Sequence, residues 1–369
     1  MDFLNAGASR PANDGARADH LRAANDLVRQ TLARHGLIST GGEGKTPPHG
    51  DLQQTISNAL AQAGIATSTP LQFRKPGTAI PVPDGAEFRQ GSFTGRTGRR
   101  DYRTYIPASA SEGVTGIVVM LHGCTQTPED FALGTGMNAL AETHRFIVIY
   151  PAQSRGDNAQ SCWNWFSKGD QRRGRGEPEI LAGIARAAMA EHGVPSERCF
   201  VAGLSAGAAM AVILGETYPD VFAAVGAHSG LPFGAASDVP SAFAAMAGTP
   251  SSERVDQAET GLRTIVFHGD ADRTVSPVNS DAIARQAERH GATGAVSTTQ
   301  TGRANGRRFS RTLTTDRDDA PQTEHWRIEG LGHAWSGGRS EGNYADPAGP
   351  DASAEMIRFF FQTAEGTMT

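Results

Sequence analysis

A serine set between two glycines is the first residue of this sequence whose setting suggests chemistry. The stretch "FVAGLSAGAAMAVILGETYP" covers residues 200–219 and places Ser205 in the pattern Gly-x-Ser-x-Gly. The run before Ser205 is apolar and β-prone and the run after it is rich in alanine, which indicates a strand, a sharp turn and a helix. Such a turn exposes a serine hydroxyl at the carboxyl end of a sheet. The pattern therefore predicts that Ser205 is a nucleophile.

A serine nucleophile needs a general base, and the base needs an acid that orients it. Where a strand–turn–helix carries the serine, the acid follows it in the chain and a histidine comes last. The segment "RTIVFHGDADRTVSP" places Asp270 and Asp272 just after an apolar run, and "EGLGHAWSGG" places His333 in a glycine-rich loop. Either aspartate could orient His333, while the other would form the turn.

Acyl transfer also needs backbone N–H groups that receive the developing oxyanion. Ala206 follows the nucleophile directly and supplies one of them. The second is expected in the loop after the third strand, where "LHGCTQT" contains Cys124. We therefore expect Cys124 to contribute its backbone N–H rather than a reactive thiol. Two other histidines that end apolar runs, His122 and His268, are expected to brace loops.

The elements that would position these residues begin near residue 87. A hairpin is predicted over 88–108, and 301–322 is interpreted as a polar loop or an edge hairpin. The expected strands are 116–123, 145–151, 198–203, 223–230, 263–269 and 324–330, and the expected helices are 177–193, 206–219, 280–291 and 350–363. Strands that alternate with helices in this way indicate an α/β fold with a mostly parallel central sheet and helices on both faces.

Residues 1–86 have a different pattern. Two segments, 20–37 and 51–65, place apolar residues at helical spacing, and glycine- and proline-rich stretches separate them. We expect residues 1–86 to form a helical N-terminal extension with linkers and residues 87–369 to form the catalytic domain. The extension could also make the protein a homodimer.

Composition excludes several classes of function. The chain has 38% hydrophobic and 20% charged residues with a formal net charge of -5, which argues against nucleic-acid binding.

The sequence has no apolar run long enough to span a membrane and no secretory signal pattern, so a cytoplasmic location is expected, with secretion as the alternative. Cys124, Cys162 and Cys199 are too few for a disulfide framework and are expected as reduced thiols. No metal or organic cofactor is expected.

Several longer segments share one resemblance. They are "LHGCTQTPEDFALGTGMNALAETHRFIVIYPAQ", "SCWNWF", "DQRRGRGEPEILAGI", "VAGLSAGAAMAVILGETYPDVFAAVGAHSGLPFGAASD" and "GLGHAWSGG". Together they resemble the catalytic domain of the polyhydroxybutyrate depolymerase family of α/β-hydrolase esterases, over about residues 88–363. The resemblance implies the α/β-hydrolase fold and selects Asp272, giving the triad Ser205, Asp272 and His333. It also implies hydrolysis of poly- or oligo(3-hydroxyalkanoates).

The resemblance assigns further residues. It places "CWNWF" in the substrate groove, so Trp163 and Trp165 are candidate substrate-binding residues, and Trp335 in "GHAWSGG" is taken with them. The alternative for Trp163 and Trp165 is that they are ordinary core aromatics. Cys124 and Cys162 could pair, but only in an oxidising compartment.

The family name leaves the substrate open. Similar proteins include feruloyl-type esterases and hydrolases of poly(aspartate), so a general short-chain carboxylesterase and an amidase remain alternatives, as does an idle scaffold that only binds. Secreted depolymerases carry a signal peptide, a linker and a polymer-binding domain, which this sequence does not display. We therefore expect a polyester or oligoester partner that is soluble or amorphous rather than crystalline.

Overall fold

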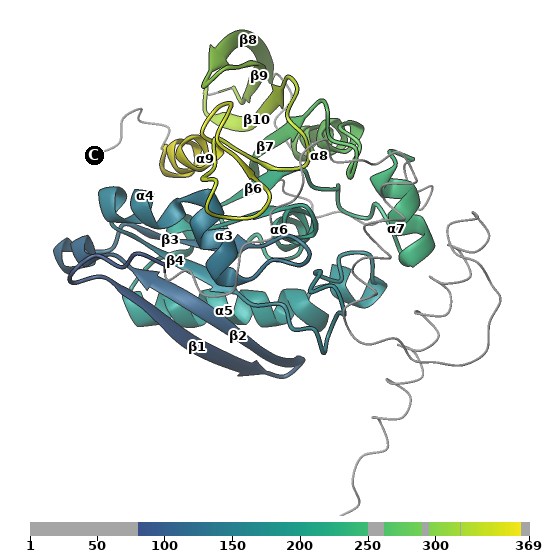
Figure 1. Ribbon diagram of the computed structural model, residues 1–369. Coiled ribbons are helices and arrows are strands. Elements are labelled where there is room, and N and C mark those ends of the chain that lie inside the picture. Colours follow the sequence, from purple (N-terminus) through teal and green to yellow (C-terminus); the bar gives the residue numbers. More distant parts are fainter. Residues whose placement is uncertain (1–79, 250–261, 290–294, 318, 363–369) are drawn as a thin grey trace, which may run out of the picture. The chain divides into compact units, whose positions relative to one another are not determined.

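The computed structural model describes residues 80–249, 262–289, 295–317 and 319–362. The predicted helices of the N-terminal extension, and the homodimer expected from them, fall outside these residues. The described part is built on a ten-stranded sheet with the order β1-β2-β4-β3-β5-β6-β7-β10-β9-β8 (Figure 1). The strands are β1 (Glu87–Gly95), β2 (Gly98–Ile106), β3 (Gly116–Leu121), β4 (Phe146–Pro151), β5 (Cys199–Leu204), β6 (Ala224–His228), β7 (Arg263–Gly269), β8 (Val296–Ala304), β9 (Arg307–Thr315) and β10 (Pro321–Ile328).

The middle of the sheet is parallel and both edges are antiparallel. Strands β4, β3, β5, β6, β7 and β10 run parallel to one another. The predicted hairpin is confirmed as β1–β2, and the segment 301–322 contains most of an edge hairpin, β8–β9, rather than a polar loop. Asn305 and Gly306 form its turn with positive φ angles of 42° and 84°, as a two-residue hairpin turn requires.

Helices cover both faces of the sheet, as predicted. They are α3 (Pro128–Thr135), α4 (Met137–His144), α5 (Gly176–His192), α6 (Ala206–Thr217), α7 (Val239–Met246), α8 (Val278–Arg289) and α9 (Ala352–Phe361), with 3-10 turns η1 (Ala108–Glu112), η2 (Lys168–Gln171) and η3 (Ser196–Arg198). On β3, Val119 packs in a core with α5 and α6, whereas its neighbour Val118 packs in a second core with α4 and α9. Alternation along a strand buried on both faces produces these two cores.

Three of these helices are additional to the predicted ones. Helices α3, α4 and α7 are each eight residues long, which is too short for a clear apolar periodicity. Their starts are nevertheless encoded locally. Thr127 caps α3 through the Asp130 N–H, and Asp238 and Ser241 form a capping box at α7.

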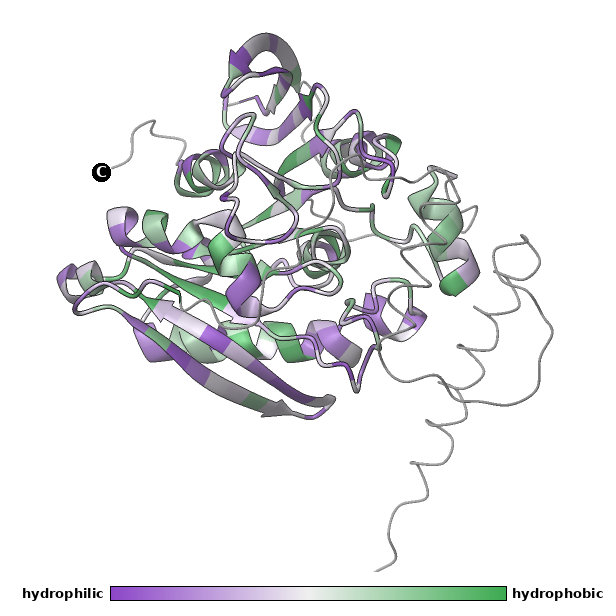
Figure 2. Ribbon diagram, viewed as in Figure 1, coloured by the Kyte–Doolittle hydropathy of each residue, from purple (hydrophilic) through white to green (hydrophobic). Residues whose placement is uncertain are grey.

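The hydropathy of the chain follows this architecture. Figure 2 shows hydrophobic residues concentrated in the central strands, whereas the β1–β2 hairpin is largely hydrophilic. None of the helices in the described ranges has both the length and the apolar character needed to cross a membrane.

A buried carboxylate joins the last strand of the parallel region to the last helix. Glu324 on β10 has no exposed side-chain surface and is bonded by the guanidinium groups of Arg311 on β9 and Arg358 on α9. Burial raises the pKa of Glu324, but the hydrogen bonds and charges of the two arginines outweigh burial and hold that pKa below its ordinary value. This cluster ties β9, β10 and α9 together.

Replacing Glu324 should therefore destabilise the fold. Glu324→Ala leaves two partly buried guanidinium groups without their carboxylate, and we expect the free energy of unfolding to fall by about 3–5 kcal/mol in urea denaturation. The control is Arg308→Ala, which breaks the exposed Arg308–Glu329 pair and should cost about 0–1 kcal/mol. Equal losses in the two variants would contradict this assignment.

Candidate active site

The serine turn has the geometry expected of a nucleophile. Strand β5 ends at Leu204, Ser205 takes the unusual angles φ 57° and ψ -119°, and α6 begins at Ala206. A Cβ on Gly207 would lie 2.0 Å from the carbonyl oxygen of Leu121, and one on Gly203 would lie 2.4 Å from the Gly207 backbone. Only glycine fits at either position, and the strained backbone at Ser205 is of the kind that clusters at functional sites.

The predicted acid and base lie in contact. Asp272 follows β7, His333 follows β10, and the Asp272 Oδ2 lies 2.7 Å from the His333 Nδ1. Because β5, β7 and β10 are parallel, the loops that carry the serine, the acid and the base all leave the same edge of the sheet.

Buried hydrogen bonds hold Asp272 in place. Its Oδ1 accepts from the N–H groups of Thr274 and Val275, both at 2.9 Å, and the His268 Nε2 lies 3.2 Å from its Oδ2. Burial raises the pKa of Asp272, but the charge of His333 and the hydrogen bonds from His268 and His333 outweigh burial and keep that pKa well below its ordinary value. The carboxylate is therefore ionised and oriented toward His333.

The competing aspartate has a different role. Asp270 is exposed, and its Oδ1 accepts the hydrogen bond of the Gly330 N–H at 2.7 Å. It joins the end of β7 to the end of β10 and makes no hydrogen bond to His333 in the described residues. The geometry thus favours Asp272 as the partner of His333.

Two backbone N–H groups beside the serine donate no hydrogen bond to another described residue. The neighbouring donors are used: the N–H of Ser205 donates to the His228 carbonyl oxygen, and that of Gly123 to the Gln126 Oε1. Within the described ranges, the N–H groups of Cys124 and Ala206 have no recorded acceptor. A Cβ on Gly123 would lie 3.7 Å from the Ser205 Cβ, so the two loops are adjacent.

Cys124 is part of a disulfide, which corrects the expectation of reduced thiols. Its sulfur is bonded to that of Cys162, 38 residues later in the chain. This bond attaches the loop after β3 to the segment that contains "CWNWF". Cys199 is a free, buried cysteine, and desolvation raises the pKa of its thiol to about 12, so it is unreactive.

The three tryptophans predicted to bind substrate are core residues in the structure. Trp163, Trp165 and Trp335 are all buried, with exposed fractions of 0, 6 and 1%. The Trp163 indole donates to the His122 carbonyl oxygen and the Trp335 indole to the Ser353 Oγ. These contacts agree with the core-aromatic alternative: Trp163 supports the loop after β3, and Trp335 supports the segment after His333.

A buried polar network lies beneath the disulfide loop. Glu177, at the start of α5, accepts hydrogen bonds from Gln153 and from the backbone N–H of Asn164. Burial raises the pKa of Glu177 to about 7, while the nearby Arg100 opposes the rise. The network anchors both ends of the loop that carries Cys162.

Two buried histidines brace the site loops. The His122 Nε2 accepts from the Gln153 N–H, and burial lowers the pKa of His122 to about 4. The His228 Nε2 accepts from the Ser336 N–H, and burial, followed by the charges of His268 and His333, keeps the pKa of His228 well below its ordinary value. Both rings are therefore neutral and serve as hydrogen-bond acceptors.

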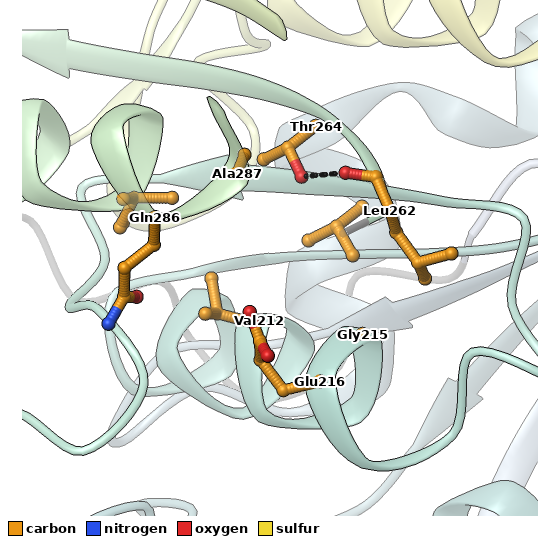
Figure 3. A pocket seen from close by; sticks show the side chains of 9 residues that line it. Val212, Gly215, Glu216, Leu262, Thr264, Gln286 and Ala287 are labelled. Carbon is orange, nitrogen blue, oxygen red and sulfur yellow. Dashed lines mark hydrogen bonds between the residues drawn. The ribbon is translucent and has the colours of Figure 1, made fainter. Parts of the chain in front are cut away.

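The pocket in Figure 3 lies away from these residues. It sits toward the carboxyl end of α6, whereas Ser205 precedes the amino end of that helix. Its lining residues are Val212, Gly215, Glu216, Val225, Leu262, Thr264, Ile283, Gln286 and Ala287. About 20 Å³ of space suffices for roughly one water molecule and is far too small for an ester substrate.

Reducing the disulfide should destabilise the protein. A bond between residues 38 apart in sequence removes chain entropy from the unfolded state, worth on the order of 3–4 kcal/mol. We expect the melting temperature of the wild type to fall in reductant, measured by circular dichroism. The double variant Cys124→Ser, Cys162→Ser should melt at the lower temperature with or without reductant. A wild type whose thiols become free without a change in melting temperature would contradict this expectation.

Comparison with known proteins adds a family to this geometry. A poly(3-hydroxyalkanoate) depolymerase C from Paucimonas lemoignei is 36% identical over 244 residues, which are 62% of this chain and 56% of that protein. An acetylxylan esterase A from Aspergillus oryzae is 29% identical over 199 residues, 49% of this chain and 64% of that protein. The chain thus spans less than two thirds of the length of either relative.

A solved structure supports the fold. The acetyl xylan esterase from Aspergillus awamori superposes with a TM-score of 0.55 at 21% identity, covering 74% of this chain and 98% of that one. The family model described as "Esterase PHB depolymerase" matches residues 100–310, more than half of the sequence. The chain therefore belongs to the PHB depolymerase esterase family, with an α/β-hydrolase fold.

Proposed function

We propose that the protein is a serine esterase that hydrolyses poly- or oligo(3-hydroxyalkanoates) such as polyhydroxybutyrate through Ser205, Asp272 and His333. The observation that carries the proposal is the partly buried Asp272–His333 hydrogen bond at the sheet edge where the strained Ser205 turn also lies. The unoccupied N–H groups of Cys124 and Ala206 beside that turn support it.

The mechanism follows from these groups. His333, oriented by ionised Asp272, takes the proton of Ser205 as the serine oxygen attacks the ester carbonyl. The N–H groups of Cys124 and Ala206 receive the oxyanion. His333 then gives the proton to the leaving alcohol, which departs and leaves an acyl-enzyme. Water, deprotonated by His333, attacks the acyl group and releases the acid and the serine.

The choice of substrate rests on the Paucimonas relative, whose name specifies a poly(3-hydroxyalkanoate). The Aspergillus relatives favour a second candidate, acetyl esters of xylan. The amidase and idle-scaffold alternatives keep the same fold. An amidase would hydrolyse amides rather than esters, and an idle scaffold would hydrolyse neither. The Cys124–Cys162 disulfide favours secretion over the cytoplasmic location that the sequence suggested, since disulfides persist in oxidising compartments.

A serine variant separates these possibilities. We expect wild-type protein to release acid from 3-hydroxybutyrate trimer and from amorphous polyhydroxybutyrate, and Ser205→Ala to lose about 10⁴-fold or more of that turnover. Acetylated xylan and a poly(aspartate) amide serve as competing substrates in the same assay. Turnover that survives Ser205→Ala would contradict the assignment of Ser205 as the nucleophile. Turnover of acetylated xylan alone would mean that the substrate is a polysaccharide ester and not a polyester.

Gln126 connects the proposed oxyanion loop to the loop of the base. It is 4% exposed; its Oε1 accepts from the Gly123 N–H and its Nε2 donates to the Asn343 carbonyl oxygen at 2.9 Å. The same Nε2 donates to Asp130, which accepts from the Asn343 N–H. No sequence pattern drew attention to Gln126, yet its amide holds the backbone of Gly123, the residue that precedes Cys124.

Removing this amide should impair catalysis more than binding. Gln126→Leu keeps the volume but leaves the Gly123 N–H and the Asn343 carbonyl unpaired, which displaces the loop that carries Cys124. We expect kcat to fall by about 10- to 100-fold, less than the 10²- to 10³-fold typical of a lost oxyanion donor, with KM within about threefold. The matched control is Gln322→Leu at the amino end of β10, whose amide bonds Asp316 and which should keep its kcat. An unchanged kcat in Gln126→Leu would contradict the positioning role.

A further inference from the structure

Tyr344 has an unusual backbone conformation close to the proposed base. It precedes β12 (Ala345–Asp346), which pairs with β11 (Trp335–Ser336), and its φ is 54°, in the left-handed region that a bulky side chain rarely adopts. Its carbonyl oxygen accepts from the Trp335 N–H at 2.7 Å, and the preceding Asn343 is bonded to Gln126 and Asp130. These contacts hold the backbone of Tyr344 in this conformation.

The phenol of Tyr344 contacts both the proposed base and the loop that carries Cys124. The Tyr344 ring meets the His333 ring edge-on, with centroids 6.5 Å apart and planes at 78°. Its hydroxyl lies 3.4 Å from the Oγ1 of Thr125, the exposed residue that follows Cys124. Thr125 is itself in the left-handed region with φ 65°, so both residues of this contact have strained backbones, as Ser205 does.

The hydroxyl of Tyr344 retains hydrogen-bonding capacity. A separation of 3.4 Å is long for a bond between two hydroxyls, for which 2.7–2.8 Å is usual. Among the described residues this hydroxyl has no other hydrogen-bond partner, and the side chain of Tyr344 is only half-buried. A hydroxyl on a residue whose backbone is already held in place can form a hydrogen bond to a ligand at little further cost in conformational entropy.

The position of the base indicates which part of a substrate the phenol would face. His333 must hand its proton to the oxygen of the leaving alcohol, so groups packed on the His333 ring lie near the alcohol portion of the ester. In a 3-hydroxyalkanoate chain that portion carries the next carboxyl group, whose carbonyl oxygen lies three carbon atoms from the leaving oxygen. A simple alkyl ester has no acceptor there.

We propose that Tyr344 is a specificity-determining residue whose hydroxyl donates a hydrogen bond to the carbonyl oxygen of the repeat unit on the leaving side of the scissile ester. The inference rests on the proposed function and adds to it a reason why an oligoester would be preferred over a simple ester. Tyr344 takes part in binding and transfers no proton.

The test compares two substrates that share the 3-hydroxybutyryl group, which in the trimer is the acyl group of the ester nearest the hydroxyl end. Wild type, Tyr344→Phe and the control Tyr102→Phe are assayed on 3-hydroxybutyrate trimer and on ethyl 3-hydroxybutyrate. Tyr102 is a half-buried tyrosine of β2, and five strands of the sheet separate β2 from β10. We expect Tyr344→Phe to lower kcat/KM on the trimer by about three- to tenfold and to leave the ethyl ester within twofold. Tyr102→Phe should change neither.

The outcomes separate this inference from the proposed function. If wild type cleaves the trimer and Tyr344→Phe cleaves it equally well, Tyr344 has no such role while the polyester function stands. An equal loss on both substrates would mean that the hydroxyl only supports the loop through Thr125, and it too overturns the proposal. If wild type cleaves the ethyl ester but not the trimer, the polyester function fails and this inference fails with it.

Discussion

The close approach of Gly207 to the end of β3 is the constraint on which the site geometry depends. With no side chain at this position, the first turn of α6 lies against the carbonyl oxygens of Leu121 and His122. This approach brings two loops together, the one that exposes Ser205 and the one that carries Cys124. A single methyl group would separate them, because the Cβ would have to occupy the space of a backbone oxygen. The proposed nucleophile and the loop of the proposed oxyanion donors therefore depend on this backbone contact for their proximity.

The remaining parts of the site are held by polar groups that are buried and satisfied. Asp272 receives two backbone N–H groups as well as His333, and Gln126 pairs with both neighbouring loops. Each bond costs little in a preorganised setting, whereas a lost partner would leave an unpaired group in the interior. The disulfide and the hydrogen bonds of the neutral His122 and His228 rings also hold these loops in place. The loops therefore behave as parts of the core although they lie at the edge of the sheet.

Much of this arrangement was predictable from local sequence, and the rest depends on long-range contacts. Glycine spacing around Ser205 and the order of acid and base carry a local signal, so the turn and the loops could be predicted. Local sequence could not choose between Asp270 and Asp272, because burial and the Thr274 and Val275 N–H groups make the difference. The spacing of Trp163 and Trp165 shows that they share a face, but not that the face is buried. The role of Gln126 depends on Asn343, 217 residues away.

That separation has a consequence for how the protein folds. Two bonds connect residues more than 200 positions apart: Gln126 in the loop after β3 with Asn343, and Thr135 at the end of α3 with Ser353 on α9. Contacts of such high sequence separation form slowly, because closing the long intervening loop costs entropy before the contact contributes any favourable free energy. The strands that pair in the sheet, including β3 with β5, lie closer together in sequence than these residues do. During refolding, the proposed esterase activity would therefore return later than the far-ultraviolet signal of the helices and strands.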